Sequence, residues 1–120
     1  MTEIQKTKVY DLEERTYLFA KRIREFVRIT PKDIANIEDA KQMIRASGSI
    51  GANYIEANEA LSKKDFTMRI KISRKEAKES RYWLRLLNIP DAKLDLERIK
   101  LEKESIELMN IFGSILRKSE

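Results

Sequence analysis

The stretch RASGSIGANYIEA, Arg45 to Ala57, decides the fold of this chain of 120 residues. It holds two of the three glycines of the protein, Gly48 and Gly51, and the residues around it have helical periodicity. A phosphate-binding P-loop requires G-x-x-x-x-G-K-[S/T] after a strand, and a dinucleotide-binding loop requires a third glycine in a βαβ unit. Neither pattern is present. We therefore expect both glycines to lie inside a helix.

In a helix, this stretch would pair small residues four positions apart, Ser47 with Gly51 and Gly48 with Ala52. Such pairs let a neighbouring backbone approach closely. A glycine inside a helix costs about 1 kcal/mol relative to alanine, so close packing has to offset that cost. We expect these four residues to form a tight helix crossing in the core. A contact between subunits through the same face, or a kink, are the alternatives.

The residues around this stretch predict four long helices. Apolar and small residues recur at steps of three and four, which is the spacing of a core-facing helix stripe. Clear examples are Leu12, Thr16, Phe19, Ile23 and Phe26, then Phe66, Ile70, Ser73, Ala77, Ser80, Leu84 and Leu87, and then Leu94, Leu101, Ser105, Leu108, Phe112 and Ile115. The predicted helices span about residues 9–28, 33–61, 63–87 and 93–117.

Helix boundaries follow from prolines and capping residues. Pro31 and Pro90 separate the first helix from the second and the third from the fourth, because the residue before a proline disfavours helix. Thr30 is the expected N-cap of the second helix, with Asp33 three residues later, and Ser62 is the expected N-cap of the third. Since no Gly or Pro lies between the second and third helices, we expect a very short connection or a kink there.

Four helices with short connections predict an all-α fold, an antiparallel up-down-up-down four-helix bundle. We expect residues 1–120 to form one domain, because this length suits a single core. Several helices carry a second apolar stripe, which favours self-association. These stripes are Met43, Ile50 and Ala57 on the second helix, Ile72, Trp83 and Leu86 on the third, and Ile99, Ile106 and Met109 on the fourth.

The composition argues against most kinds of active site. The chain has no Cys and no His, which excludes disulfides, Cys or His metal sites, and Ser-His or Cys-His triads. A catalyst would have to rely on groups such as the carboxylates Glu56, Glu76 or Glu79, so we expect no enzyme, no cofactor and no metal. No apolar run approaches the roughly 18–20 residues of a membrane span, and no signal peptide is visible. We expect a cytoplasmic protein without membrane contact.

Polar residues follow the glycines directly. Asn53 and Glu56 are three residues apart on one helix face, beside the apolar Ile50 and Ala57. An acid close to a core usually needs a partner. We expect a structural polar network that includes Asn53, Glu56 and Glu79, or a salt bridge at an interface. Acid–base chemistry or a metal site is the alternative, but the Glu-x-x-His pattern of di-iron bundles is excluded because the chain has no His.

The positive charge of the chain is concentrated on the third helix. The whole chain has a net charge of +5, whereas residues 63–85 contain nine Lys or Arg against three acids. The basic stripe consists of Lys71, Arg74, Lys78, Arg81 and Arg85, at steps of three and four, with Lys75 beside it. It is about 21 Å long at 1.5 Å per residue, and few acids on the same helix are spaced to neutralise it. Lys21, Arg22 and Arg28 of the first helix would extend it if they share its surface.

This stripe predicts a nucleic-acid contact. It has the reach to neutralise several phosphates of RNA or DNA, and no base-reading motif accompanies it, so binding would depend on the backbone and on salt. A solvated face, or a surface for a protein partner, is the alternative.

The segment QMIRASGSIGANYIEANEALSKKDF, residues 42–66, and the segment RIKISRKEAKESRYWLRLL, residues 69–87, together resemble the family of 23S rRNA intervening-sequence proteins. The pattern of that family is roughly Q-x-x-R-A-x-x-S-I-x-x-N-I-x-E-G, followed by a basic stretch with a Phe and then E-x-x-x-[W/Y]-L. The matching residues are Gln42, Arg45, Ala46, Ser49, Ile50, Asn53, Glu56, Phe66, Glu79, Trp83 and Leu84. Tyr54 replaces the usual Ile and Ala57 the usual Gly.

The resemblance implies a bacterial cytoplasmic four-helix bundle. Members of this family, and the similar accessory variability proteins of diversity-generating retroelements, form homopentameric rings, and the retroelement proteins bind nucleic acid and a reverse transcriptase. The resemblance thus implies a homo-oligomer, specifically a pentamer, and a connection with RNA, but no established activity. Our interpretation is a non-enzymatic homo-oligomer associated with RNA through the basic stripe. The alternative is a protein-interaction scaffold or accessory subunit without nucleic-acid contact.

Overall fold

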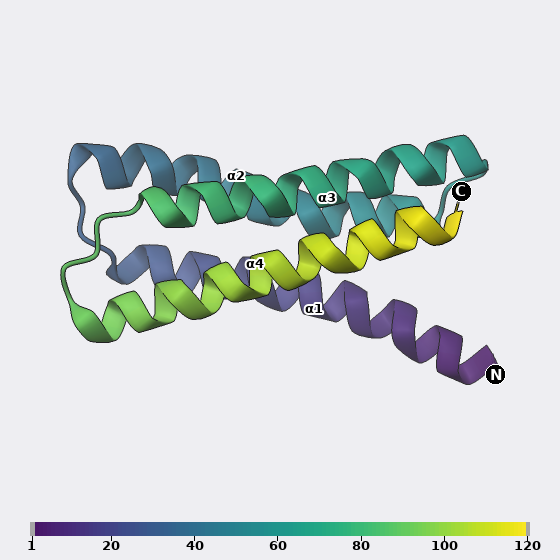
Figure 1. Ribbon diagram of the computed structural model, residues 1–120, viewed down its shortest axis with the longest axis horizontal. Helices are drawn as coiled ribbons and strands as arrows, with labels where there is room; N and C mark the ends of the chain where they lie inside the picture. Colours follow the sequence, from purple (N-terminus) through teal and green to yellow (C-terminus); the bar gives the residue numbers. More distant parts are fainter. Residues whose placement is uncertain (1, 120) are drawn as a thin grey trace.

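The computed structural model describes the backbone of residues 2–119 and the side chains of residues 11–119. Four helices make up almost all of it: α1 (Thr2–Ile29), α2 (Ile34–Asn58), α3 (Lys63–Leu86) and α4 (Ala92–Ser119). Consecutive helices run in opposite directions, and α1 leans away from the others towards its N-terminal end (Figure 1). Each helix packs against two others, and within the described chain α1 and α3 are diagonal and make no contact. The predicted all-α four-helix bundle is confirmed.

The core consists of one stripe from each helix. All five predicted core residues of α1 are buried, as are six of the seven on α3, with Phe66 half-buried. On α2, however, the buried apolar and small residues are Ala40, Met43, Ala46, Ser47, Ile50, Tyr54 and Ala57. The prediction that Met43, Ile50 and Ala57 form a second, outward stripe is therefore wrong. They belong to the core stripe, which continues through small residues that a search for large apolar side chains overlooks.

The other second stripes lie along the flanks of the bundle. Ile72, Trp83, Ile99, Ile106 and Met109 are half-buried, and Trp83 and Met109 pack against the core, whereas Leu86 is exposed. Large apolar side chains that remain exposed are scattered over the surface. They include Tyr17, Leu18, Ile29, Ile34, Ile37, Ile55, Leu61, Met68, Tyr82, Leu86 and Leu96.

The helix ends differ from prediction at three points. Helix α2 is capped by Asp33, whose carboxylate accepts from the backbone N–H of Asn36 at 2.8 Å. Thr30 is not the cap, because its buried hydroxyl donates to the carbonyl of Val27. Helix α2 ends at Asn58 instead of near Leu61, and the expected short connection to α3 consists of four residues. Helix α1 begins at Thr2 instead of near Val9.

Ser62 is the N-cap of α3, as predicted, and its hydroxyl accepts from the backbone N–H of Asp65 at 3.0 Å.

Asn36 joins the two connections at one end of the bundle. Its side chain is almost fully buried, and its amide nitrogen donates to the carbonyls of Pro31 and Asn88, at 3.2 and 2.9 Å. Its amide oxygen accepts from the backbone N–H of Asn88 at 3.0 Å. The α1–α2 connection is thereby held against the α3–α4 connection, and both lie at the same end of the molecule (Figure 1).

The glycine stretch forms the middle of α2, and Gly51 is the point where α1 comes closest. A Cβ added to Gly51 would stand 2.8 Å from Oγ1 and 3.2 Å from Cβ of Thr16 on α1. At Gly48 the nearest atom is Nη2 at the end of the long Arg24 side chain, at 3.2 Å. Ser47 is fully buried, but Ala52 is exposed and takes no part in the crossing.

Candidate nucleic-acid interface

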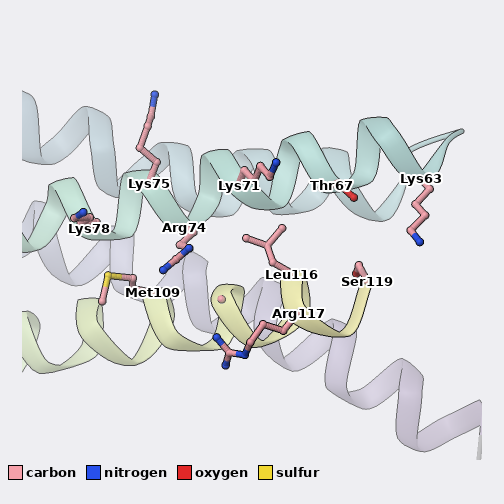
Figure 2. Close-up of a pocket in the computed structure, with 11 residues that line it drawn as sticks. Lys63, Thr67, Lys71, Arg74, Lys75, Lys78, Met109, Leu116, Arg117 and Ser119 are labelled. Carbon is pink, nitrogen blue, oxygen red and sulfur yellow. The ribbon is translucent and has the colours of Figure 1, made fainter.

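A groove of about 850 Å³ lies along the surface between α3 and α4, and four of the six predicted basic residues line it (Figure 2). Apolar or small residues of α4 line one side, namely Met109, Gly113 and Leu116. The cations that line the groove are Lys63, Lys71, Arg74, Lys75 and Lys78 from α3 and Arg117 from α4. No carboxylate is among the lining residues. The groove is therefore an open, positively charged surface with apolar residues of α4 at its base.

The core stripe of α3 determines where these cations point. Because Ile70, Ser73 and Ala77 face the core, Lys71, Arg74 and Lys78 lie on the flank of α3 that faces α4. Arg74 extends towards α4, whereas the side chain of Lys75 is directed away from it (Figure 2). Neighbouring cations on α3 thus differ in their access to the groove.

Two members of the predicted stripe are not in the groove. Arg81 is half-buried, and its Nε lies 3.5 Å from Oε1 of Glu102 on α4. Arg85 is exposed and does not line the groove. The expectation that all six cations form one continuous surface is thus too broad.

The cations of α1 do not extend this surface, because α1 lies diagonally across the bundle from α3 in the described chain. Arg22 instead donates to Glu97 of α4 at 3.2 Å.

Five arginines outside the groove form salt bridges, namely Arg15, Arg22, Arg69, Arg81 and Arg98, whereas Arg24, Arg28, Arg45 and Arg85 form none with residues 11–119. Arg15 on α1 donates from Nε and Nη2 to the two oxygens of Glu104 on α4, each at 2.8 Å. These hydrogen bonds hold the pKa of Arg15 above its ordinary value. Arg98 bonds Asp95 and lowers the pKa of that carboxyl. By contrast, none of the six cations of the groove forms a salt bridge with any side chain of residues 11–119.

The predicted polar network of Asn53, Glu56 and Glu79 is not formed. The amide nitrogen of Asn53 donates to the carbonyl of Ser49 at 2.9 Å, and its oxygen accepts from Arg69 at 3.1 Å. Glu56 is exposed and Glu79 half-buried, and among the described side chains no hydrogen bond joins either to Asn53. Glu56 lies one turn beyond Asn53 and faces solvent, so it needs no buried partner.

Glu76 is the carboxylate that the structure buries. Only 7% of it is exposed, and its Oε1 has no hydrogen-bond partner among the described residues. Burial, and then the neighbouring Glu79, raise the pKa of Glu76, while Lys75 and Arg45 oppose the shift. Residues 11–119 contain no group of three or more acidic side chains arranged to hold a metal ion. The buried carboxyl of Glu76 lies near the carboxylate of Glu79, on the same helix.

The sequence predicts that α3 is the basic helix, but it does not predict that α4 lines the same groove. Arg117, Met109, Gly113 and Leu116 complete the groove. One signal was available: in an antiparallel pair the end of α4 lies beside the beginning of α3, so Arg117 had to approach Lys63. None of the four helices, as far as residues 2–119 define them, is long and apolar enough to cross a membrane.

Comparison with known proteins identifies relatives of this chain. The model of the 23S rRNA-intervening sequence protein family matches residues 8–114. The chain is also similar to a crystal structure of a protein of unknown function from the S23 ribosomal protein family of Bacteroides thetaiotaomicron, with 29% identity and a TM-score of 0.75 over 92% of this chain and 98% of that one. No curated protein matches. Because the family model covers most of its length, the chain belongs to the 23S rRNA-intervening sequence protein family.

Proposed function

We propose that this protein binds RNA through the groove between α3 and α4, without catalysing a reaction. The observation that supports the proposal is the set of six cations that line one groove without a carboxylate. The same chain pairs Arg15, Arg22, Arg81 and Arg98 with acids elsewhere. Unpaired cations in a shared groove attract a polyanion, and the family name points to RNA as that polyanion. A cytoplasmic location is part of the proposal, because RNA is found there.

The number of cations in the groove determines how steeply the affinity for RNA should fall with salt concentration. For a single strand, log K falls by about 0.7 per tenfold rise in salt for each phosphate contact. If Lys63, Lys71, Arg74, Lys78 and Arg117 each meet one phosphate, the slope is about −3.5. Affinity should then fall about 100-fold between roughly 50 and 200 mM salt.

The test is a fluorescence-anisotropy titration with a labelled single-stranded RNA of about 12 nucleotides, repeated across that salt range. In the groove variant, Lys71, Arg74, Lys78 and Arg117 are all changed to Glu. In the control variant, the exposed Lys21, Lys93, Lys100 and Lys103, which do not line the groove, are changed to Glu. The two variants carry the same net charge. We expect the groove variant to lose binding and the control to keep most of it; equal loss in both would refute the proposed groove.

Homo-oligomerisation, as a pentamer, is part of the same proposal. It is supported by the resemblance to a family of pentameric proteins and by large apolar side chains that the single chain leaves exposed, such as Tyr17 and Leu18 on α1. Light scattering tests it directly, because one chain has a mass of 14.2 kDa and a pentamer has five times that mass. A monomeric mass at micromolar concentration would remove the oligomer from the proposal.

The second candidate is a scaffold or accessory subunit for another protein, without direct contact to nucleic acid. The fully exposed Leu61 and the exposed Met68 near the lysine-rich start of α3 favour this candidate. Binding that persists at high salt and depends on these two residues would support it over RNA binding.

A further inference from the structure

Gly113 of α4 lines the groove, and two arginine side chains approach it. A Cβ added there would stand 3.5 Å from Nη1 of Arg117 and 3.6 Å from Nε of Arg74. Arg74 reaches down from α3, and Arg117 folds back along α4 (Figure 2). Gly113 is buried. The two guanidinium groups thus come from different helices and converge on the same bare piece of helix backbone.

This convergence brings two positive charges together without a counter-ion. The two nitrogens lie at most about 7 Å apart, because each is about 3.5 Å from the same point. No carboxylate lines the groove there, and neither arginine has a hydrogen-bond acceptor among the described side chains. Their repulsion is relieved when an anion sits between them. A guanidinium presents its N–H groups as a planar fork that matches the oxygens of a phosphate.

We propose that Arg74 and Arg117 form a discrete phosphate site above Gly113, in which one phosphate group accepts hydrogen bonds from both guanidinium groups. The identity of the ligand rests on the proposed function: the phosphate is a phosphodiester of a single-stranded RNA that lies along the groove. Lys71 and Lys78, one turn away from Arg74 on either side, face the phosphates before and after it.

A single strand fits this site better than a duplex. The two guanidinium groups approach the backbone of α4 at Gly113, beside the apolar Met109 and Leu116, and both arginines are exposed. The bases of a duplex are paired and stacked, so they cannot lie on apolar side chains of the groove. A single strand can enter and place unstacked bases on the apolar Met109 and Leu116.

A double-mutant cycle tests whether the two arginines share one phosphate. Arg74→Met and Arg117→Met should each weaken binding of the labelled single strand about tenfold, as expected for one hydrogen bond to a charged group. If both arginines hold the same phosphate, the double variant should lose only about 20-fold, since interacting residues are not additive. The matched cycle pairs Arg74→Met with Lys75→Met, whose side chain points away from α4. In this control cycle the loss of affinity of the double variant should equal the product of the two single losses. Multiplying effects in the Arg74–Arg117 cycle would overturn the shared site.

Two further measurements test whether binding depends on where the two guanidinium groups lie or only on the total charge of the groove. Gly113→Leu keeps every charge of the groove but places side-chain atoms where the guanidinium groups meet, so it should weaken binding as much as the double arginine variant. Circular dichroism shows whether that variant is folded. If it is not, the wild-type protein is titrated with inorganic phosphate, and the Nε–H signals of Arg74 and Arg117 are followed by NMR. They should shift together and with the same dissociation constant; independent shifts would overturn the site.

These experiments distinguish failure of the site from failure of the function. If the groove variant loses RNA binding while Arg74 and Arg117 act independently, the phosphate site is refuted and the RNA-binding groove stands. If the wild-type protein binds no RNA but inorganic phosphate still shifts both arginine signals together, RNA binding is refuted. The site then stands, with a small phosphate compound as its ligand.

Discussion

The two glycines of α2 should respond in opposite directions to the same substitution, Gly→Ala. At Gly48 the added methyl meets only the end of Arg24, at 3.2 Å, and this flexible side chain can move aside. The variant Gly48→Ala should therefore gain the helix propensity of alanine, up to about 1 kcal/mol in the free energy of unfolding. At Gly51 the methyl would stand 2.8 Å from Oγ1 and 3.2 Å from Cβ of Thr16.

Thr16 cannot yield as Arg24 can. It is buried, and its hydroxyl donates to the carbonyl of Glu13 at 2.9 Å. Overpacking in a core costs about 1–3 kcal/mol, which outweighs the gain in propensity. We expect Gly51→Ala to destabilise the protein by about 1 kcal/mol net, so that the two variants differ by about 2 kcal/mol.

Thermal and urea unfolding, followed by circular dichroism at one fixed protein concentration, measure this difference. It should appear as a separation of about 8 °C in Tm, at roughly 4 °C per kcal/mol for a domain of this size. Adding Thr16→Ala to Gly51→Ala should recover part of the loss, because the hydroxyl that the methyl meets is removed. If Gly51→Ala is as stable as Gly48→Ala, then α1 does not approach α2 as closely as described.

Three other substitutions test contacts away from the groove. Asn36→Ala should destabilise the protein by about 2–3 kcal/mol, because it leaves buried backbone groups of the two connections unpaired; the exposed Asn110→Ala is the control and should change stability by less than about 0.5 kcal/mol in urea unfolding. Burial raises the pKa of Glu76, so the folded protein binds the proton of this carboxyl more tightly than the unfolded chain does. The contribution of Glu76 to the free energy of unfolding is therefore greatest at low pH and is lost as pH rises through the pKa of the folded state. Glu76→Gln should therefore stabilise the protein at pH 7, by about 1 kcal/mol, and flatten the decline of urea stability above about pH 4.5; an unchanged profile would contradict the buried position. Arg15→Met should cost about 1 kcal/mol, because it leaves the half-buried Glu104 without its two hydrogen bonds, and Glu104→Gln in the same background should restore part of that loss in thermal melts.

The fold could be predicted because three helices repeat large apolar residues at steps of three and four. Helix α2 was harder, since its core stripe passes through Ala40, Ser47 and the polar Asn36. These residues carry little hydrophobic signal, so Met43 and Ile50 seemed to belong to a separate stripe. Asn36 faces the core because the neighbouring connection supplies its hydrogen-bond partners, and that juxtaposition cannot be derived from local sequence.

The candidate site could be predicted only in part, for a similar reason. Helical spacing placed Lys71, Arg74 and Lys78 on one flank of α3, and the structure agrees. Which cations stay free depends on the facing helix: Glu102 of α4 reaches Arg81, whereas Gly113 leaves Arg74 unopposed. The sequence of α3 alone contains neither fact.

The bonds between Asn36 and Asn88 bear on the register of the bundle. Stripes that repeat every seven residues can in principle slide by one repeat, about 10.5 Å, and still bury apolar side chains. Such a shift of the α3–α4 hairpin along the α1–α2 hairpin would separate Asn36 from the backbone of Asn88 and leave polar groups unpaired in the core. A single buried asparagine can select one register among several at some expense in stability. In this protein Asn36 thereby determines which residues of α3 lie opposite α2, such as Ser73, whose hydroxyl donates to the carbonyl of Ile50 at 2.9 Å. The apolar stripes alone leave that choice open.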